Sequence, residues 1–129
     1  MQTEITRQAN DLALLRSPVS EFLTLAGQQI QPGAKGKMIW DASTGTGLFL
    51  TVGLPALPPD KIYQLWVIAD QKPISAGIFS VDLQGRGELR VINLPPTHLI
   101  QAFAVTLEPA GGVPQPTGEK YLIGLFSKI

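Results

Sequence analysis

Short apolar stretches that alternate with polar residues follow one another through most of this chain. From Val19 onward, apolar side chains recur at every second position, as they do at Met38, Trp40 and Ala42. Similar segments occupy residues 48–54, 103–107 and 121–125. This period is that of half-buried β-strands. Turn signals rich in Gly, Pro, Ser and Asp separate them, at residues 31–33, 43–47, 57–60, 82–85 and 94–96.

Regular turns between short strands predict a sandwich or barrel of about seven or eight strands. Of the two, we expect an antiparallel β-sandwich with Greek-key connections. No segment of helical period separates the strands, so parallel βαβ units are not expected. At 129 residues the chain suits one domain. Its hydrophobic fraction of 44% and charged fraction of 16% are typical of a folded unit.

The charge balance and the lack of cysteine exclude several classes of function. Ten basic and ten acidic residues give a net charge of zero, which argues against binding to nucleic acid or to anionic lipid. The absence of cysteine excludes disulfides, thiolate catalysis and cysteine-based zinc sites. No apolar run reaches the ~18–20 residues that span a bilayer, and the charged N-terminal segment is not a secretory signal.

The strand that contains Trp66 is apolar on both faces. Ile62, Trp66 and Ile68 share one face, whereas the other carries Tyr63, Leu65 and Val67. Such a strand is expected to be central, with its second face covered by a loop or a terminal segment. Its polar exception, Gln64, is expected to form hydrogen bonds at the sheet surface. The chain then turns at residues 70–73 and returns through residues 74–79, where Gly77 predicts a bulge or a close backbone approach.

The segment after the strand at residues 103–107 is the best candidate for an interaction site. Residues 108–118 form a longer connection than most hairpins have. Its prolines limit the entropy of the unfolded chain, and its glycines permit positive φ angles. We regard two roles as open, an interaction loop and a stiff connector. The candidate residues are Glu108, Pro109, Gly111, Gly112, Pro114, Pro116, Thr117 and Gly118.

These two regions resemble the extracytoplasmic C-terminal domain of the anti-sigma-K factor (RskA) family. The resemblance lies in the YQLWVI strand from Tyr63, the KPISAGIF return from Lys72 and the VTLEPAGGVPQPTG segment from Val105. It covers roughly residues 19 to 128, with supporting similarity at residues 38–41 and 52–58. The ordered Gly and Pro positions make it specific.

The resemblance implies a regulatory protein that is not an enzyme. Family members join a cytoplasmic zinc-type anti-sigma domain and one membrane helix to this outer domain. They hold an extracytoplasmic-function sigma factor inactive until regulated proteolysis releases it. The sigma factor would therefore bind a cytoplasmic domain outside this chain, a transmembrane helix outside the chain would anchor it, and a protease would be a further partner. We expect this chain to be the extracytoplasmic piece of that longer protein.

The N-terminal segment has helical periodicity. Its apolar residues Ile5, Ala9, Leu12 and Leu15 are spaced by four, three and three, and Pro18 disfavours further helix. Two roles are open, a short helix packed on the domain and a membrane-proximal spacer. We expect residues 1–18 to be a helical spacer or linker and residues 19–129 to be the RskA-like β-domain.

No residues are assigned to catalysis, to a cofactor or to a metal. The single histidine, His98, lacks ionisable neighbours in the sequence, and the GxG at residues 45–47 precedes a strand, whereas phosphate loops precede a helix. Carboxylates that could pair for glycoside hydrolysis or bind calcium fall mostly at strand ends and turns, without the calcium-loop spacing: Asp41, Asp60, Asp70, Asp82, Glu88 and Glu108.

The alternative function is a secreted or periplasmic β-sandwich module that binds a glycan or a protein ligand. Four aromatic residues could form a platform for sugar stacking: Trp40, Tyr63, Trp66 and Tyr121. Most of them lie on strongly apolar strands, which favours packing in a core. A hydrolase ranks last, because no nucleophile, base and orienting group occur together.

Overall fold

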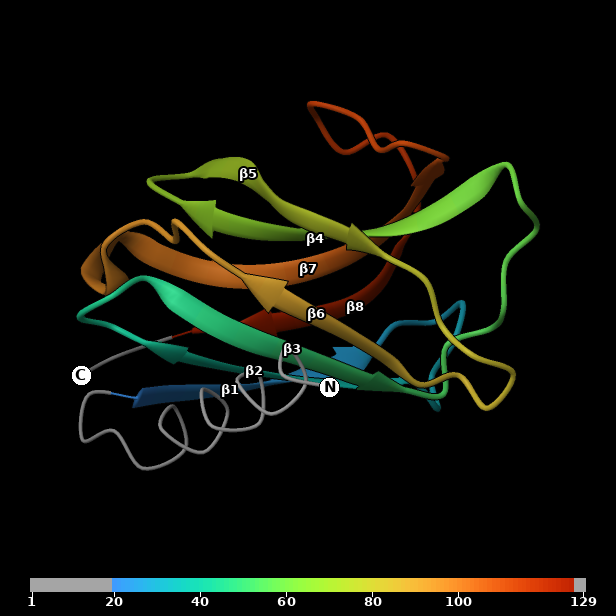
Figure 1. Ribbon diagram of the computed structural model, residues 1–129, viewed down its shortest axis with the longest axis horizontal. Helices are drawn as coiled ribbons and strands as arrows, with labels where there is room; N and C mark the ends of the chain where they lie inside the picture. The colour runs from blue at the N-terminus through green and yellow to red at the C-terminus, as the bar shows by residue number, and fades with distance from the viewer. Residues whose placement is uncertain (1–19, 127–129) are drawn as a thin grey trace, which may run out of the picture.

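Antiparallel β-strands make up nearly all regular structure in residues 20–126, the part of the chain that the structure describes (Figure 1). This computed structural model confirms the all-β class. The helical spacer predicted for residues 1–18 lies outside the described residues. The elements are β1 (Ser20–Gly27), β2 (Lys35–Asp41), β3 (Thr46–Val52), β4 (Lys61–Ala69), β5 (Lys72–Phe79), β6 (Gly87–Val91), the 3-10 helix η1 (Thr97–Leu99), β7 (Ile100–Pro109) and β8 (Lys120–Leu125).

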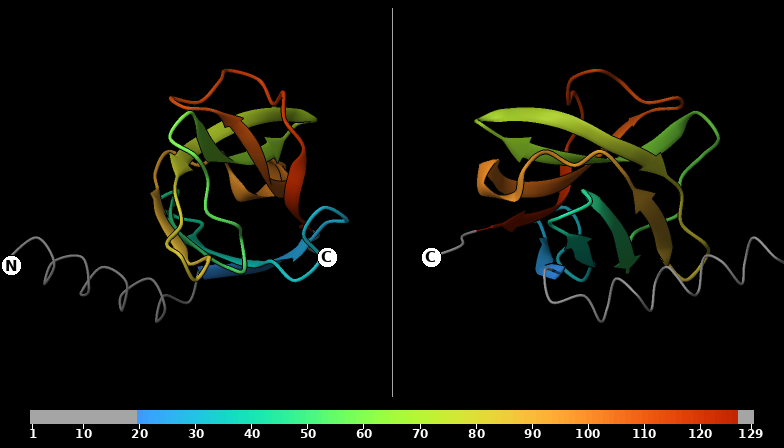
Figure 2. Two further views of the ribbon diagram at one scale, coloured as in Figure 1. Left: turned by 90° about the vertical axis from the view of Figure 1, so that its right-hand side faces the viewer. Right: turned by 60° about the vertical axis from the view of Figure 1, so that its left-hand side comes forward.

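The eight strands form one sheet in the order β5-β4-β7-β8-β1-β2-β3-β6. The sheet curls until its two edges meet, which gives a nearly closed barrel with two facing layers (Figure 2). Because β6 follows β5 across this seam and β7 returns beside β4, the strands β4 to β7 form a Greek key. The predicted sandwich is thus a single curled sheet.

Side chains close the seam between β5 and β6. A Cβ added at Gly77 would lie 3.0 Å from Cδ2 of Leu89, so the Leu89 side chain of β6 packs on the backbone of β5. Gly77 has a φ of +136° and lies beside a bulge, because Leu65 pairs with Gly77 whereas Trp66 pairs with Ser75. The bulge predicted at Gly77 is therefore confirmed, and the group that approaches its backbone closely is the Leu89 side chain.

The turn between β4 and β5 is tighter than predicted. Only Asp70 and Gln71 connect the strands, and both have positive φ angles, 50° and 63°, as a type I′ hairpin requires. The predicted turn residues Lys72 and Pro73 belong to β5. The turn is attached to the neighbouring strand segment, because Asp70 N–H donates to Leu99 O at 3.2 Å and Gln71 N–H donates to Gln101 Oε1 at 2.6 Å.

Aromatic rings fill the interior of the barrel. Trp40, Phe49, Tyr63 and Phe103 have no exposed surface. Ring centroids of Trp40 and Phe103 are 5.2 Å apart, and those of Tyr63 and Phe79 are 5.7 Å apart. The Tyr63 hydroxyl donates to Pro55 O at 2.6 Å, which satisfies a polar group that would otherwise be costly to bury. Burial, with a smaller contribution from Tyr121, raises the pKa of Tyr63.

In two strands, the residues that point into the core differ from those that simple alternation suggests. In β3 the pairing of Phe49 with Met38 places Phe49 in the core, while Leu50 and Val52 are 37% and 48% exposed. In β8 a register shift lets both Tyr121 and Leu122 reach the core. Leu125, which strict alternation would place on the same face as Tyr121, is 78% exposed. A bulge reverses the alternation after it, which the sequence period alone does not reveal.

Candidate functional site

Four neighbouring side chains on β4 and β7 point away from the barrel interior and are nevertheless buried. Gln64 and Trp66 come from β4, and Thr106 and Glu108 come from β7. They are 3%, 0%, 0% and 1% exposed, respectively. Alternation dictates their direction, because Leu65, Val67 and Val105 lie in the barrel core. The second face of the Trp66 strand is therefore covered, as its two-sided apolar pattern predicted.

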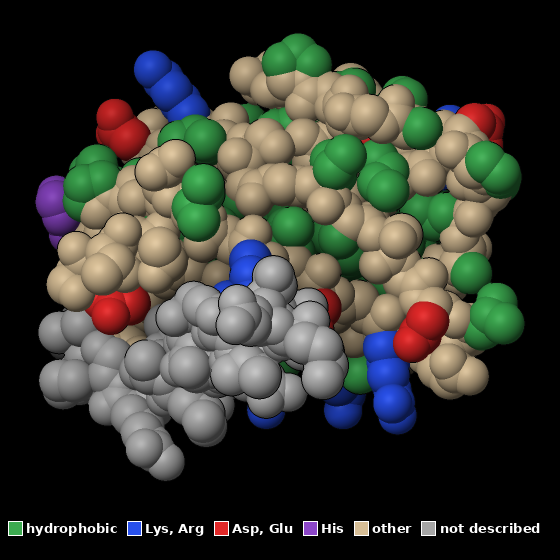
Figure 3. All heavy atoms as spheres, viewed as in Figure 1, with side chains coloured by type: hydrophobic (Ala, Val, Ile, Leu, Met, Phe, Trp, Pro, Cys, Tyr) green, Lys and Arg blue, Asp and Glu red, His purple; other side chains and the backbone are tan. Residues whose placement is uncertain are grey.

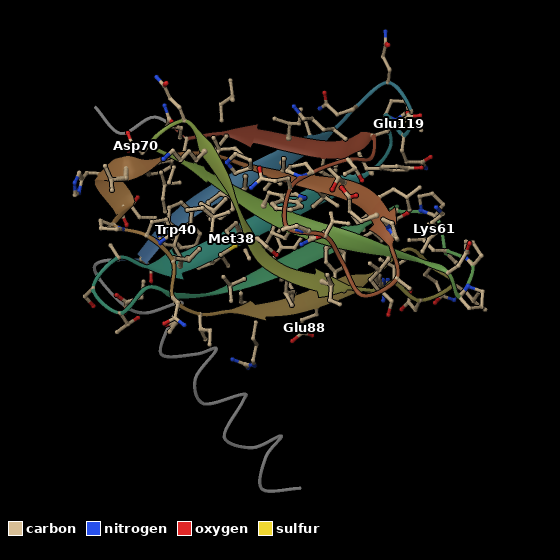
Figure 4. The ribbon with its side chains drawn as sticks, turned by 90° about the horizontal axis from the view of Figure 1, so that it is seen from above. Met38, Trp40, Lys61, Asp70, Glu88 and Glu119 are labelled. Atoms are coloured by element: carbon tan, nitrogen blue, oxygen red, sulfur yellow. The ribbon has the colours of Figure 1, made fainter. Side chains whose placement is uncertain are left out.

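The cover is the connection between β7 and β8, residues 110–119, which we call the β7–β8 loop. It arches above the outer side of the sheet in both views of Figure 2, and from above it crosses over β4 (Figure 4). Two side chains of the sheet bind its central part, and these two anchors contain most of the polar contacts.

The first anchor is the carboxylate of Glu108. Thr106 Oγ1–H donates to Glu108 Oε2 at 2.6 Å. The backbone N–H groups of Thr117 and Gly118 donate to the same oxygen at 3.1 and 3.2 Å, and the Thr117 hydroxyl donates to Oε1. Trp66 Nε1–H donates to Thr106 Oγ1 at 2.8 Å. One hydrogen-bonded chain thus joins the indole, the sheet and the loop.

The environment of Glu108 acts on its ionisation in two directions. Burial disfavours the charged form and by itself raises the pKa, whereas the hydrogen bonds donated by Thr106, Thr117 and Gly118 lower it. The hydrogen bonds together have a larger effect than burial, so the pKa of Glu108 lies below its ordinary value. The carboxylate is therefore ionised at neutral pH, and its hydrogen bonds are of the stronger, charge-assisted kind.

The second anchor is the amide of Gln64. Its Nε2 donates to Val113 O at 3.0 Å, while Val113 N–H donates to Oε1 at 3.0 Å. Nε2 also donates to the Ser75 hydroxyl at 2.7 Å. The amide thus pairs with both backbone groups of one loop residue, as a neighbouring strand would. The expected hydrogen bonds of Gln64 at the sheet are present, and they are made beneath the loop.

Glycine is required at two points of the loop. Gly112 has a φ of +79°, and a Cβ there would lie 2.9 Å from Cγ2 of Ile78 and 3.2 Å from Oε1 of Gln64. A Cβ at Gly118 would overlap the carbonyl oxygen of Leu107. These contacts explain how the loop approaches the sheet so closely.

Two of the eight predicted loop residues, Glu108 and Pro109, belong to β7 and not to the loop. The eight residues divide into two groups. Glu108, Gly112, Thr117 and Gly118 fasten the loop to the sheet, whereas Pro109, Gly111 and Pro114 are exposed and Pro116 is half-buried. Sequence reasoning missed Thr106 and Trp66 as parts of this site. The signal for the site was Gln64, a polar residue in an otherwise apolar strand.

The other candidate residues are not brought together. His98 is exposed in η1, and among residues 20–126 no group of three His, Asp or Glu side chains is placed to hold a metal. Asp41 and Asp82 accept hydrogen bonds within their own turns, from Ser43 and from the backbone of Gln84 and Arg86. Residues 42–45 form the turn between β2 and β3, so Thr46 and Gly47 of the predicted turn belong to β3.

The proposed sugar platform does not exist on the surface. Trp40, Tyr63 and Trp66 have no exposed area, and Tyr121 is only 8% exposed. On the face that Figure 3 shows, acidic and basic side chains are scattered and do not gather by sign. Within the described part of the chain, no helix has the length and apolar character to cross a membrane.

The buried Gln64 and Glu108 anchors lie within the segments that carry the family resemblance. The family described as "Anti-sigma-K factor rskA, C-terminal" matches residues 1–120. The chain belongs to this family. Membership in the RskA C-terminal family confirms the resemblance seen in the sequence, and the match also includes the N-terminal segment.

Two curated relatives are similar over 94 residues, which is 73% of this chain and 38% of each relative. One is the anti-sigma-K factor RskA of Mycolicibacterium vanbaalenii, at 27% identity. The other, at 29% identity, is a Streptomyces griseus protein that bears the name "Uncharacterized protein in phr 5'region". The matched part of this RskA C-terminal chain thus spans about two fifths of the length of these relatives. No solved structure matches the chain.

Proposed function

We propose that this domain is the extracytoplasmic sensor or regulatory domain of a membrane-anchored anti-sigma factor. The observation that carries the proposal is the family match over residues 1–120. In support, the relative from M. vanbaalenii is named an anti-sigma-K factor. In this proposal the domain is not an enzyme, and it acts on an extracytoplasmic-function sigma factor through regulated proteolysis.

The proposal assigns the partners to different parts of the whole protein. The sigma factor binds a cytoplasmic domain, a transmembrane helix anchors the protein, and residues 1–18 form the spacer that leads from the membrane to the β-domain. The barrel limits the access of a regulatory protease to this spacer. The β7–β8 loop is the part of the barrel that receives the signal, because it joins exposed residues to buried anchors.

A topology and reporter experiment on the full-length protein tests the proposal. Alkaline phosphatase fused after Ile129 should be active, since this enzyme matures only outside the cytoplasm. Deletion of residues 20–126 should change transcription from a promoter that depends on the sigma factor, at an unchanged level of the anti-sigma protein. An inactive fusion would place the domain on the other side of the membrane and refute the proposal. Unchanged transcription in inducing and non-inducing conditions would refute the regulatory role.

Binding by the chain itself provides a second test. Because the proposal assigns sigma-factor binding to a cytoplasmic domain, residues 1–129 alone should not bind a purified sigma factor in calorimetry. Micromolar binding would show that this chain is itself the inhibitory part, and the assignment of partners would then be wrong.

A further inference from the structure

The sheet side chains bind the β7–β8 loop through the kinds of contact that a receptor makes with an extended peptide. Gln64 forms hydrogen bonds with both backbone groups of Val113, through one donor and one acceptor. Glu108 contacts a hydroxyl and two successive N–H groups, at Thr117 and Gly118. Main-chain pairing and a nearby specific contact are the two elements by which sheet surfaces recognise extended peptides.

Apart from these anchors, no hydrogen bond is described for the middle of the loop. The described backbone hydrogen bonds of the loop lie at its ends: Ala110 N–H donates to Asp60 O at 2.9 Å, Gly112 N–H donates to Pro109 O at 3.0 Å, and Leu107 N–H donates to Glu119 O at 3.2 Å. Pro114 and Pro116 cannot donate. The hydrogen bonds described for residues 113–118 all go to Gln64 or Glu108.

Release of the loop would uncover a surface suited to binding. Trp66 has no exposed area in the closed state, and its Nε1–H already has a partner within the sheet, Thr106. The hydrogen bond of the indole is therefore made within the sheet and does not depend on the loop. An aromatic ring beside an amide and a carboxylate offers apolar area together with directional contacts, as recognition sites do.

We propose that the β7–β8 loop is a releasable cover, and that the surface of Gln64, Trp66, Thr106 and Glu108 binds an extended peptide segment of another protein. The preferred segment is uncharged and tolerates proline. It carries a Ser or Thr followed by Gly, four residues after the residue whose backbone pairs with Gln64. This spacing is that of Val113 and Thr117, the segment that occupies the site within the chain. The inference does not rest on the anti-sigma proposal, since it concerns only this surface.

Native-state hydrogen exchange on the whole chain tests whether the cover opens. The N–H groups of Val113, Thr117 and Gly118 should exchange at least about tenfold faster than those in the middle of β4 and β7. Their exchange rates should not rise with added denaturant, because a local opening of the loop exposes little new surface. If these three groups exchange only with the rest of the sheet, the loop is a fixed part of the barrel and the proposal fails.

A peptide experiment tests the binding surface. In one variant, residues 113–118 are replaced by a Gly-Ser sequence of equal length, so that Gln64, Trp66 and Glu108 remain. Its circular dichroism should show the barrel intact. A synthetic peptide with the sequence of residues 111–119 should bind this variant with a dissociation constant on the order of a millimolar. The natural loop is tethered to the sheet and so has an effective concentration of that size, which the free peptide lacks. Binding is measured by Trp66 fluorescence and by NMR shifts on β4.

The matched variants decide whether the binding is specific. Added to the loop-replaced protein, Gln64→Ala or Glu108→Gln should weaken peptide binding at least about fivefold, whereas Gln84→Ala and Glu119→Gln, which change exposed residues outside the anchors, should not. A peptide in which Val replaces Thr117 should bind the loop-replaced protein as weakly as the unchanged peptide binds the same protein with Glu108→Gln. A folded variant that shows no shifts at saturating peptide, or equal binding by all four variants, would overturn the proposal.

Discussion

Trp66 and Thr106 are joined by a 2.8 Å hydrogen bond, from Nε1–H to Oγ1, on the side of the sheet that faces away from the barrel core. The Thr106 hydroxyl in turn donates to Glu108, so it receives one hydrogen bond and gives another. The domain thus has a second small core, between the sheet and the β7–β8 loop. This outer core couples a buried ring to a loop that the solvent reaches.

Trp66→Ala should destabilise the domain by about 3–5 kcal/mol, because removal of a fully buried ring leaves a cavity and also removes the partner of Thr106. Chemical denaturation followed by circular dichroism measures the change. Phe22→Ala is the control, since Phe22 is 60% exposed and should cost less than about 1 kcal/mol. A loss below about 1 kcal/mol at Trp66 would show that the ring is not packed.

Glu108→Gln keeps the shape of the side chain but places an amide group among four donors. We expect a loss of about 1–3 kcal/mol in the free energy of unfolding, since at least one buried donor loses its acceptor. Glu119→Gln changes an exposed carboxylate in the same loop and should have little effect. Equal stabilities for the two variants would contradict the role of Glu108 as an anchor.

The free energy of unfolding should depend on pH through the ionisation of Glu108. Its pKa in the folded protein is lowered from the ordinary 4.5, so in acid the unfolded state binds a proton that the folded state lacks. The stabilisation from this group is complete above the unfolded pKa and is lost as the pH falls through the folded pKa. Wild-type stability should therefore fall more steeply than that of Glu108→Gln as the pH is lowered below about 4.5. Parallel curves would refute this prediction.

Gly118→Ala should disrupt the closure of the loop, because the added Cβ would overlap the Leu107 carbonyl oxygen, a backbone atom that cannot rotate away. The expected results are a lower melting temperature and faster hydrogen exchange at Val113. Gly33→Ala is the matched control, since no atom lies within 4 Å of a Cβ at that position. That variant should match or slightly exceed the wild type in stability.

Much of the fold could be predicted from local patterns, because strands and turns depend on short stretches of sequence. The central strand with two apolar faces and the special role of Gly77 followed from such patterns. The inward direction of Phe49 did not, since the opposite face of β3, with Leu48, Leu50 and Val52, is the more apolar one. Phe49 instead pairs with the core residue Met38 and shares its face. Likewise the Asp70–Gln71 turn lacks glycine and gave no signal of its type.

The candidate site was predictable in part. The length and glycines of residues 108–118 identified the loop, and Gln64 stood out in its strand. That the loop folds back over β4 depends on contacts such as Gln64 with Val113, which lie 49 residues apart in the sequence. Pairings across such distances are decided by the whole fold, and no local spacing predicts them.

The seam at Gly77 and Leu89 also governs how this domain behaves among other proteins. A curled sheet that stops short of full closure has two edge strands, and open edges invite pairing with foreign strands. Here the two edges pack on each other, because the Leu89 side chain lies 3.0 Å from the position that a Cβ on Gly77 would take. Pro73 adds protection, since it removes one backbone donor from β5. The contact between Leu89 and Gly77 thus brings the two edges together where β5 and β6 are not paired in the sheet, and it leaves less of each edge open to a foreign strand.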